Sequence, residues 1–232
     1  MYSPGGFARR AFSLRGFRMA RVRVYVDGFN LYYGALKPAP ALRWLDLVAF
    51  CDRLRPGDTV DHVRYFTARV TGAQDATAPG RQQLYLKALG TLPRISIHLG
   101  QFRTHEVMMP VAATTPVKYA RVLKTEEKGS DVNLATWLLL DGVDGLYEEA
   151  VVISDDSDLA EPVAEACRRF GPVHVVSPRG PAKTPTGPRR PHVMSRAGAS
   201  WTPVDPADLA AAQLPDEILL PTGRTITRPP RW

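Results

Sequence analysis

Residues 151–158 read VVISDDSD, and this stretch decides the fold that we expect for the chain. Residues 151–153 form a short apolar run of β-branched side chains, which predicts a buried strand. The run stops at Ser154, and the next four positions hold three acids, Asp155, Asp156 and Asp158. Like charges this close together at a strand end are unfavourable unless a cation or a positive partner lies among them.

The residues that follow the acids have the apolar spacing of a helix. Leu159, Val163 and Ala166 recur at intervals of three and four positions within residues 159–169. The acids are therefore expected in a strand-to-helix turn. In open α/β sheets, such turns are where ligands bind.

Strand and helix patterns alternate through the rest of the chain. Residues 21–27 (RVRVYVD) predict a first strand with Asp27 at its carboxyl end. Further strands are expected at residues 60–70, 95–99 and 173–176, and helices at residues 44–54, 81–89 and 206–213. Residues 101–119 give mixed signals and predict an irregular excursion or hairpin. The alternation predicts an α/β fold with a mostly parallel sheet covered on both faces.

Composition places the chain among ordinary globular proteins with one principal domain, since 44% of its 232 residues are hydrophobic and 23% are charged. No apolar run approaches the roughly 20 residues of a membrane helix, so no membrane partner is expected. Only two cysteines, Cys51 and Cys167, occur. This argues against a disulfide framework or a thiolate zinc site and favours the cytoplasm. The net charge of +7, together with acids concentrated at one point, suggests a polyanionic partner brought to a cation site, and a solvated basic surface with basic tails explains the charge equally well.

The two ends of the chain differ in composition from its middle. Residues 1–20 are expected to be a disordered basic leader without a secretory signal, and Met19 is an alternative start that lowers the net charge from +7 to +3 by removing four arginines. We expect the main domain at residues 21–177 and a Pro/Arg-rich loop at residues 178–200. Residues 201–232 are expected to form an extension that packs on the domain.

Residues 124–140, KTEEKGSDVNLATWLLL, form the second informative stretch. Ser130 is expected to cap a helix, which places Asp131 in the first helical turn. An acid at this position is also favoured by the helix dipole alone. Lys128 and the two glutamates before it are expected in a loop, where charged residues are usually solvated.

The acids form a pattern when they are considered together. Asp27 and the aspartates after residue 153 follow two strands, and Asp131 begins a helix that can face the same rim of the sheet. If the strands are neighbours, the carboxylates converge on one site whose oxygen ligands suit Mg²⁺ or Mn²⁺ better than zinc. A metal held in this way is suited to the hydrolysis of phosphodiester bonds.

Three motifs resemble, in this order, those of prokaryotic NYN domains, the LabA-like branch of the PIN-like nuclease superfamily. They are VYVDGFNLYYG (residues 24–34), EEKGSDVNLA (126–135) and VVISDDSDLAEPV (151–163). The resemblance covers roughly residues 21–176 and implies a three-layer α/β/α, PIN-like (Rossmannoid) fold with metal-dependent ribonuclease activity on RNA. It also implies that the catalytic residues and metal ligands are Asp27, Asp131, Asp156 and Asp158.

Four polar residues are candidate substrate contacts, namely Asn30, Lys128, Ser154 and Ser157. The resemblance implies that Asn30 contacts substrate or orients a carboxylate. The two serines have an alternative role in hydrogen bonds to the backbone of their turn. Many relatives have glycine or asparagine where this chain has Asp155, and we expect the additional carboxylate to face solvent.

Other functions are open to the same pattern. An RNA-binding or regulatory module without catalysis would satisfy the same residues, and a homo-oligomer is a further candidate assembly. A phosphatase-type hydrolase would need an acid two positions after Asp27, where this chain has Phe29. A dinucleotide-binding Rossmann domain would need a glycine-rich turn after the first strand, which the sequence lacks.

Overall fold

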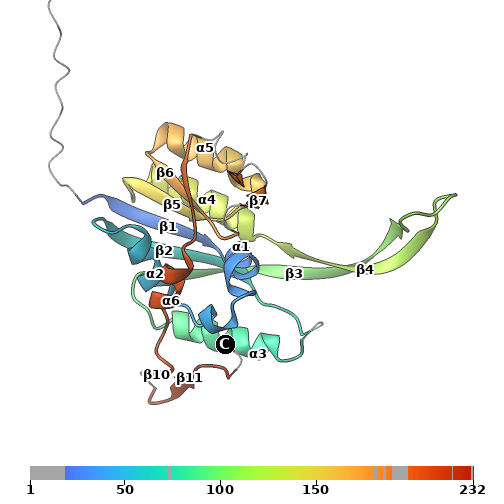
Figure 1. Cartoon of the computed structure of the whole chain (residues 1–232), viewed down its shortest axis with the longest axis horizontal. Coiled ribbons are helices and arrows are strands. Elements are labelled where there is room, and N and C mark those ends of the chain that lie inside the picture. The colour runs from blue at the N-terminus through green and yellow to red at the C-terminus, as the bar shows by residue number, and fades with distance from the viewer. Residues whose placement is uncertain are drawn as a thin grey trace, which may run out of the picture.

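The computed structural model describes residues 19–72, 75–179, 182–184, 187–189, 198–220, 222–230 and 232. Its centre is a sheet with the strand order β4-β3-β2-β1-β5-β6-β9 (Figure 1). The strands are β1 (Arg21–Asp27), β2 (Thr59–Ala68), β3 (Ile95–Pro110), β4 (Tyr119–Lys128), β5 (Glu149–Ile153), β6 (Val173–Ser177) and β9 (Ser200–Pro203). Only β3 and β4 pair antiparallel in this sheet.

Helices cover both faces of the sheet because the strands bury side chains on both sides. Val24 and Val26 of β1 face a core that includes α2 (Leu47–Leu54) and α3 (Ala78–Leu89). Tyr25, between them, faces a second core with α4 (Ser130–Val143) and α5 (Ala160–Arg169). The prediction of a three-layer α/β/α fold with a mostly parallel sheet is confirmed.

Short elements complete the described chain. They are α1 (Gly28–Leu31), η1 (Tyr32–Leu36), η2 (Pro40–Leu42), η3 (Ser157–Leu159), α6 (Pro206–Ala211), and two small antiparallel pairs, β7 (Ala182–Thr184) with β8 (Gly187–Arg189) and β10 (Glu217–Leu219) with β11 (Thr225–Thr227). None of the described helices is both long enough and apolar enough to cross a membrane.

The structure describes only part of the expected leader, Pro/Arg-rich loop and C-terminal extension. Residues 1–18 of the expected leader (1–20) lie outside the described residues, as do residues 180–181, 185–186 and 190–197 of the expected Pro/Arg-rich loop. The domain boundaries therefore stay predictions. In the last part of the chain, β9 pairs with β6, and Leu209, Leu214 and Ile226 are buried in the core that contains α2 and α3.

The hairpin of β3 and β4 differs from the sequence-based expectation. We expected a strand to end at residue 99 and residues 126–128 to be a loop, but the pairing runs from Gln101 opposite Lys128 to Pro110 opposite Tyr119. The hairpin extends away from the rest of the molecule (Figure 1). Both of its faces are largely exposed there, with Leu123 at 73%. Such a ribbon lacks the alternation of a half-buried strand, which is why the sequence pattern was ambiguous.

A buried ionic cluster holds α4 against the sheet. Asp141 of α4 is 1% exposed. Its carboxylate accepts hydrogen bonds from the Tyr25 hydroxyl and from Nε and Nη2 of Arg64, each at 2.8 Å, and it pairs with Arg23 at 3.1 Å. Burial acts to raise the pKa of Asp141, but the bonds from Arg64, Tyr25 and Arg23 outweigh it and hold the pKa below its usual value. The cluster fixes the position of α4 relative to β1 and β2.

Candidate metal centre

Three carboxylates converge at the carboxyl end of the central strands. Asp27 ends β1, Asp156 follows β5, and Asp131 lies in the first turn of α4. Strands β1 and β5 are parallel neighbours, with Val26 opposite Ile153, so their carboxyl ends lie side by side. One carboxylate oxygen from each of the three aspartates lies within 4.8 Å of the other two. The structure thus brings together three of the four predicted acids.

Asp27 is buried and held by several hydrogen bonds. Its carboxylate accepts from the Asn30 backbone N–H at 3.0 Å, from Asn30 Nδ2 at 2.6 Å and from Ser154 Oγ at 2.8 Å. Burial raises the pKa of Asp27, the bonds from Asn30 and Ser154 oppose that rise, and the negative charge of Asp156 adds to it. The carboxylate is fixed in orientation, and a cation beside it would favour its charged form.

Asn30 and Ser154 therefore serve the carboxylates. Asn30 Oδ1 accepts from the Asp155 backbone N–H at 3.3 Å, so this side chain ties α1 to the turn after β5. Ser154 is fully buried, and its Oγ both donates to Asp27 and accepts from the Asp156 backbone N–H at 3.0 Å. The prediction that Ser154 contacts substrate is corrected by this burial, because the side chain has no surface to offer. For Asn30, the geometry matches the orienting alternative.

Asp131 has the most unusual electrostatic environment of the three. Its pKa is raised to about 6, first by burial and then by the negative charges of Asp27, Asp156, Glu127 and Asp158. The helix N-terminus opposes the rise, because its dipole favours a negative charge. The sequence led us to expect such a crowding of like charges where a cation or a positive partner binds.

The fourth predicted acid, Asp158, stands apart from the three. It is exposed in η3, and its backbone N–H donates to Asp156 Oδ1 at 2.9 Å. Ser157, in the same turn, is also exposed. Asp158 influences the site through its charge rather than as a member of the group of three carboxylates.

Two further predicted residues have structural partners. Asp155 is partly exposed, as expected of a side chain that meets solvent, and its carboxylate also accepts from the Arg179 backbone N–H at 3.0 Å. The chain leaving β6 passes close enough to bond it. Lys128, predicted to contact a phosphate, ends β4 and pairs with Glu126 at 3.3 Å.

Glu127 is a contributor that sequence reasoning missed. Its Oε1 accepts from the Ser130 backbone N–H at 3.2 Å and from Ser130 Oγ at 2.9 Å, and its charge helps to raise the pKa of Asp131. Gly100 on β3 leaves room for this carboxylate, because a Cβ at Gly100 would collide with Glu127 Oε1. The available signal was its position three residues before the helix start, which an expected solvated loop obscured.

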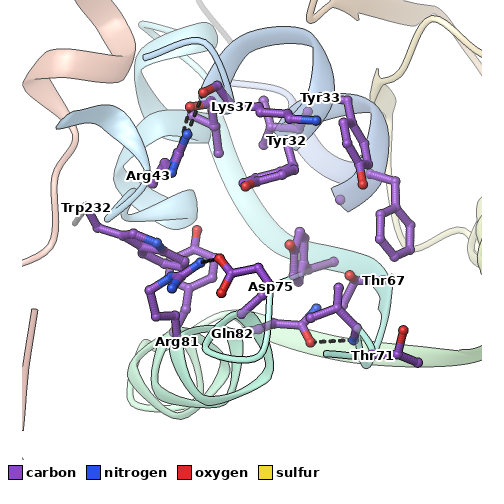
Figure 2. A pocket seen from close by; sticks show the side chains of 18 residues that line it. Tyr32, Tyr33, Lys37, Arg43, Thr67, Thr71, Asp75, Arg81, Gln82 and Trp232 are labelled. Atoms are coloured by element: carbon purple, nitrogen blue, oxygen red, sulfur yellow. Dashed lines mark hydrogen bonds and ion pairs between the residues drawn. The ribbon is translucent and has the colours of Figure 1, made fainter. Parts of the chain in front are cut away.

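A cavity of about 370 Å³ lies next to this centre, on the side of α1 that faces α3. It begins at Gly28, the residue after Asp27. Figure 2 shows Tyr32, Tyr33, Lys37 and Arg43 on one side of it and Arg81, Gln82 and Trp232 on the other. Sequence reasoning did not find this cavity, because its walls come from distant parts of the chain.

Comparisons with known proteins give one family and two individual similarities. The family model of the NYN domain matches residues 21–189. A curated protein from Pseudomonas putida (strain DSM 28022 / S16), 6-hydroxy-3-succinoylpyridine 3-monooxygenase HspA, is 28% identical over 242 residues, covering 91% of this chain and 75% of that protein. A crystal structure of a protein of unknown function from Vibrio parahaemolyticus RIMD 2210633 matches with a TM-score of 0.49 and 14% identity, covering 84% of this chain and 97% of that one.

Proposed function

The chain belongs to the NYN domain family of the PIN-like nuclease superfamily, and from this premise we propose that it is a divalent-metal-dependent ribonuclease. The observation that carries the proposal is the group formed by Asp27, Asp131 and Asp156, whose carboxylate oxygens lie within 4.8 Å of one another. The substrate in this proposal is RNA, which agrees with the net charge of +7. We also propose a cytoplasmic location, because Cys51 and Cys167 are both free thiols.

The chemistry of the three side chains fits a divalent ion. All three offer carboxylate oxygens, which are the ligands that Mg²⁺ and Mn²⁺ favour. No ion pair between described residues involves Asp27, Asp131 or Asp156, so their mutual repulsion is not relieved by a described lysine or arginine. We propose Mg²⁺ or Mn²⁺ as the cofactor.

The chain's own residues would prepare the site for this chemistry. When bound, a divalent ion neutralises the phosphate and lowers the pKa of a water molecule. Asn30 and Ser154 hold the Asp27 carboxylate in one orientation, and the Asp158 backbone N–H holds that of Asp156. Asp131 projects from the start of α4, which the Asp141 cluster fixes. Carboxylates fixed in advance need no costly rearrangement during the reaction.

The test is the cleavage of end-labelled RNA by purified wild type and Asp156→Asn, each with Mg²⁺, with Mn²⁺ or with EDTA. Asp155→Asn is the matched control, since Asp155 is the adjacent acid and lies outside the group of three. Its asparagine keeps an oxygen that can accept from Arg179. We expect Asp156→Asn and EDTA to abolish cleavage while Asp155→Asn retains it. Cleavage that survives both Asp156→Asn and EDTA would sink the proposal.

The same experiment distinguishes a ribonuclease from a non-catalytic module. RNA that is bound by wild type but never cut, with either metal and in two protein preparations, would replace the ribonuclease by an RNA-binding or regulatory NYN protein.

A second candidate function is the hydroxylation of a small heteroaromatic acid. It is favoured by the 28% identity to a protein named as a 6-hydroxy-3-succinoylpyridine monooxygenase, together with the aromatic and cationic side chains of the cavity. A monooxygenase places one oxygen atom of O₂ in its substrate and reduces the other to water with two electrons from a reductant. In the test, the protein is given 6-hydroxy-3-succinoylpyridine, O₂ and either NADH or NADPH. The oxidation of the nicotinamide is then measured. Substrate-dependent oxidation would support this candidate, and its absence with both nicotinamides would count against it.

A further inference from the structure

We propose that the cavity beside the metal centre binds a planar heteroaromatic ring that carries an oxygen acceptor, and that an unpaired base of the substrate RNA is this ring. The identity of the ring rests on the proposed ribonuclease function. The cavity itself rests on geometry alone. Its volume of about 370 Å³ is within the range of small-molecule pockets, roughly 300–1,000 Å³.

The walls of the cavity are rich in aromatic rings. On one side, Tyr33 lies 5.3 Å from Tyr32 and 6.5 Å from Phe29, measured between ring centroids. On the other side, Trp232 lies 5.5 Å from Tyr85. Rings on two sides of a space this size favour a flat aromatic ligand, which gains stacking and the burial of apolar area. Single-stranded nucleic acids are commonly held by stacking of this kind.

Arg81 supplies a cationic side chain in the wall of the cavity. Its Nη2 pairs with Asp75 at 2.7 Å and its Nη1 bonds the Thr77 hydroxyl, so the guanidinium is held in place. Its Nε is covered by protein atoms and has no hydrogen-bond partner among the described residues, so this atom is not a contact for a ligand. The side chain nevertheless lines the cavity, and its positive charge favours a ligand that carries an oxygen acceptor. The carbonyl oxygens of nucleobases are acceptors of this type.

The side-chain amide of Gln82, the next residue, is not free to bind the ligand. Gln82 Nε2 donates to the Ala68 carbonyl at 2.8 Å, and its Oε1 accepts from the Val70 N–H at 2.9 Å, so both ends of the side chain are occupied. Lys37 is exposed at the opposite edge, with its Nζ 4.7 Å from the centre of the Tyr33 ring. A cation at the mouth of the cavity suits a ligand that also carries a phosphate.

Helix α1 connects the cavity to the metal centre. Its N-cap is Asp27, and its first two residues, Gly28 and Phe29, line the cavity. A Cβ at Gly28 would come within 2.7 Å of the Phe66 carbonyl oxygen and 2.8 Å of the Tyr65 ring, so α1 packs closely on β2 at this point. An RNA strand that places a phosphate at the carboxylates can therefore cross α1 and place a nearby base in the cavity.

The test measures RNA binding separately from RNA cleavage. Fluorescence anisotropy with Mg²⁺ would follow the binding of a labelled single-stranded RNA of about eight nucleotides. It would be repeated with the same backbone carrying abasic positions. All proteins carry Asp156→Asn, which prevents cleavage on the proposed function. The test variants are Tyr33→Leu and Arg81→Gln. The matched control is Tyr119→Leu, since Tyr119 is a 62% exposed tyrosine on β4, outside the cavity, and Tyr33 is 56% exposed.

We expect Tyr33→Leu and Arg81→Gln each to weaken binding of the base-carrying RNA roughly 10-fold, and Tyr119→Leu to leave it unchanged. The abasic RNA should bind the test variants and the control alike. Equal binding of the base-carrying RNA by Tyr33→Leu and Tyr119→Leu would overturn the inference, even if wild type proves to be a nuclease. Conversely, base-dependent binding lost in Tyr33→Leu would support it even if wild type cuts no RNA.

A calorimetric titration distinguishes an RNA base from a free pyridine as the ligand of the cavity. Wild type and Tyr33→Leu are each titrated with 6-hydroxy-3-succinoylpyridine and with uridine monophosphate. Binding of uridine monophosphate that Tyr33→Leu weakens would support a base in the cavity. Binding of the pyridine alone, lost in Tyr33→Leu, would overturn the RNA base as the occupant.

Discussion

Replacing Asp131 with asparagine should make the metal-free protein more stable at pH 8. In the folded chain, burial raises the pKa of Asp131 from its usual 3.8 to about 6, with added repulsion from neighbouring acids. The folded state therefore holds a proton that the unfolded state has lost between about pH 4 and pH 6. The protonated side chain carries no penalty below about pH 4. The penalty of the charged form grows as the pH rises and is complete above about pH 6.

The size of this effect follows from the difference in pKa. The pKa values of Asp131 in the folded and unfolded states differ by about two, and a pKa difference of one corresponds to roughly 1.4 kcal/mol. The penalty for the charged form is therefore at most about 3 kcal/mol. Asp131 is partly exposed, and solvent screening reduces this figure to about 1.5 kcal/mol. The asparagine also loses the favourable interaction with the helix N-terminus, which is worth about 0.5 kcal/mol. The expected net gain at pH 8 is about 1 kcal/mol, or roughly 2–4 °C in Tm for a chain of this length.

The assay is thermal and urea unfolding in EDTA at pH 4.5 and pH 8. The control is Glu161→Gln, because Glu161 is an exposed acid in the first turn of α5 and lies outside the acidic group. We expect Asp131→Asn to be more stable than wild type at pH 8, with a smaller difference at pH 4.5. Glu161→Gln should gain nothing at either pH. Adding Mg²⁺ at pH 8 should then stabilise wild type more than Asp131→Asn. If the variant is no more stable than wild type in EDTA at pH 8, the reasoning about crowded carboxylates is refuted.

Three further changes have defined outcomes. Asp141→Ala should lower the free energy of unfolding in urea by about 3–5 kcal/mol, because it leaves Arg23 and Arg64, whose side chains are only 13% and 11% exposed, without a buried partner. Asp61→Ala, at a 46% exposed side chain, should cost less than about 1 kcal/mol, and similar costs for both would contradict the role of the cluster. Ser154→Ala should weaken Mg²⁺ binding in calorimetry by about 10- to 100-fold, because Asp27 loses a hydrogen bond that orients it, and unchanged affinity would refute that role. Gly100→Ala should destabilise the protein by about 1–3 kcal/mol, because its Cβ would collide with Glu127 Oε1 and with the Lys128 backbone carbonyl. Glu127→Ala should relieve only the part of that loss due to the side chain in a double-mutant cycle, and strict additivity would refute the side-chain collision.

The sequence predicts the centre of this fold well because buried parallel strands have a strong local signature. The run at residues 151–153 and its acids lie in the expected strand and turn, and Asp27 ends the strand expected beside them. Neighbouring parallel strands bring their carboxyl ends together, so the meeting of Asp27, Asp131 and Asp156 could be anticipated.

What the sequence could not supply depends on contacts between distant residues. Glu127 was assigned to a solvated loop, because a ribbon exposed on both faces has no period that marks it as a strand. The bond from the Arg179 backbone to the Asp155 carboxylate joins two separate segments. The cavity depends on Tyr33, Arg81 and Trp232 meeting in space, and no local motif links them.

The hydrogen bond from Ser154 to Asp27 joins residues that are 127 positions apart in the chain. During synthesis, Asp27 therefore leaves the ribosome long before the partners that orient it. A nascent chain without β5 contains neither Ser154 nor Asp156, so it has only part of the metal centre. Any activity that depends on the complete group can begin only after β5 has been made and has docked beside β1. An unfinished chain that lacks β5 therefore lacks part of this acidic group.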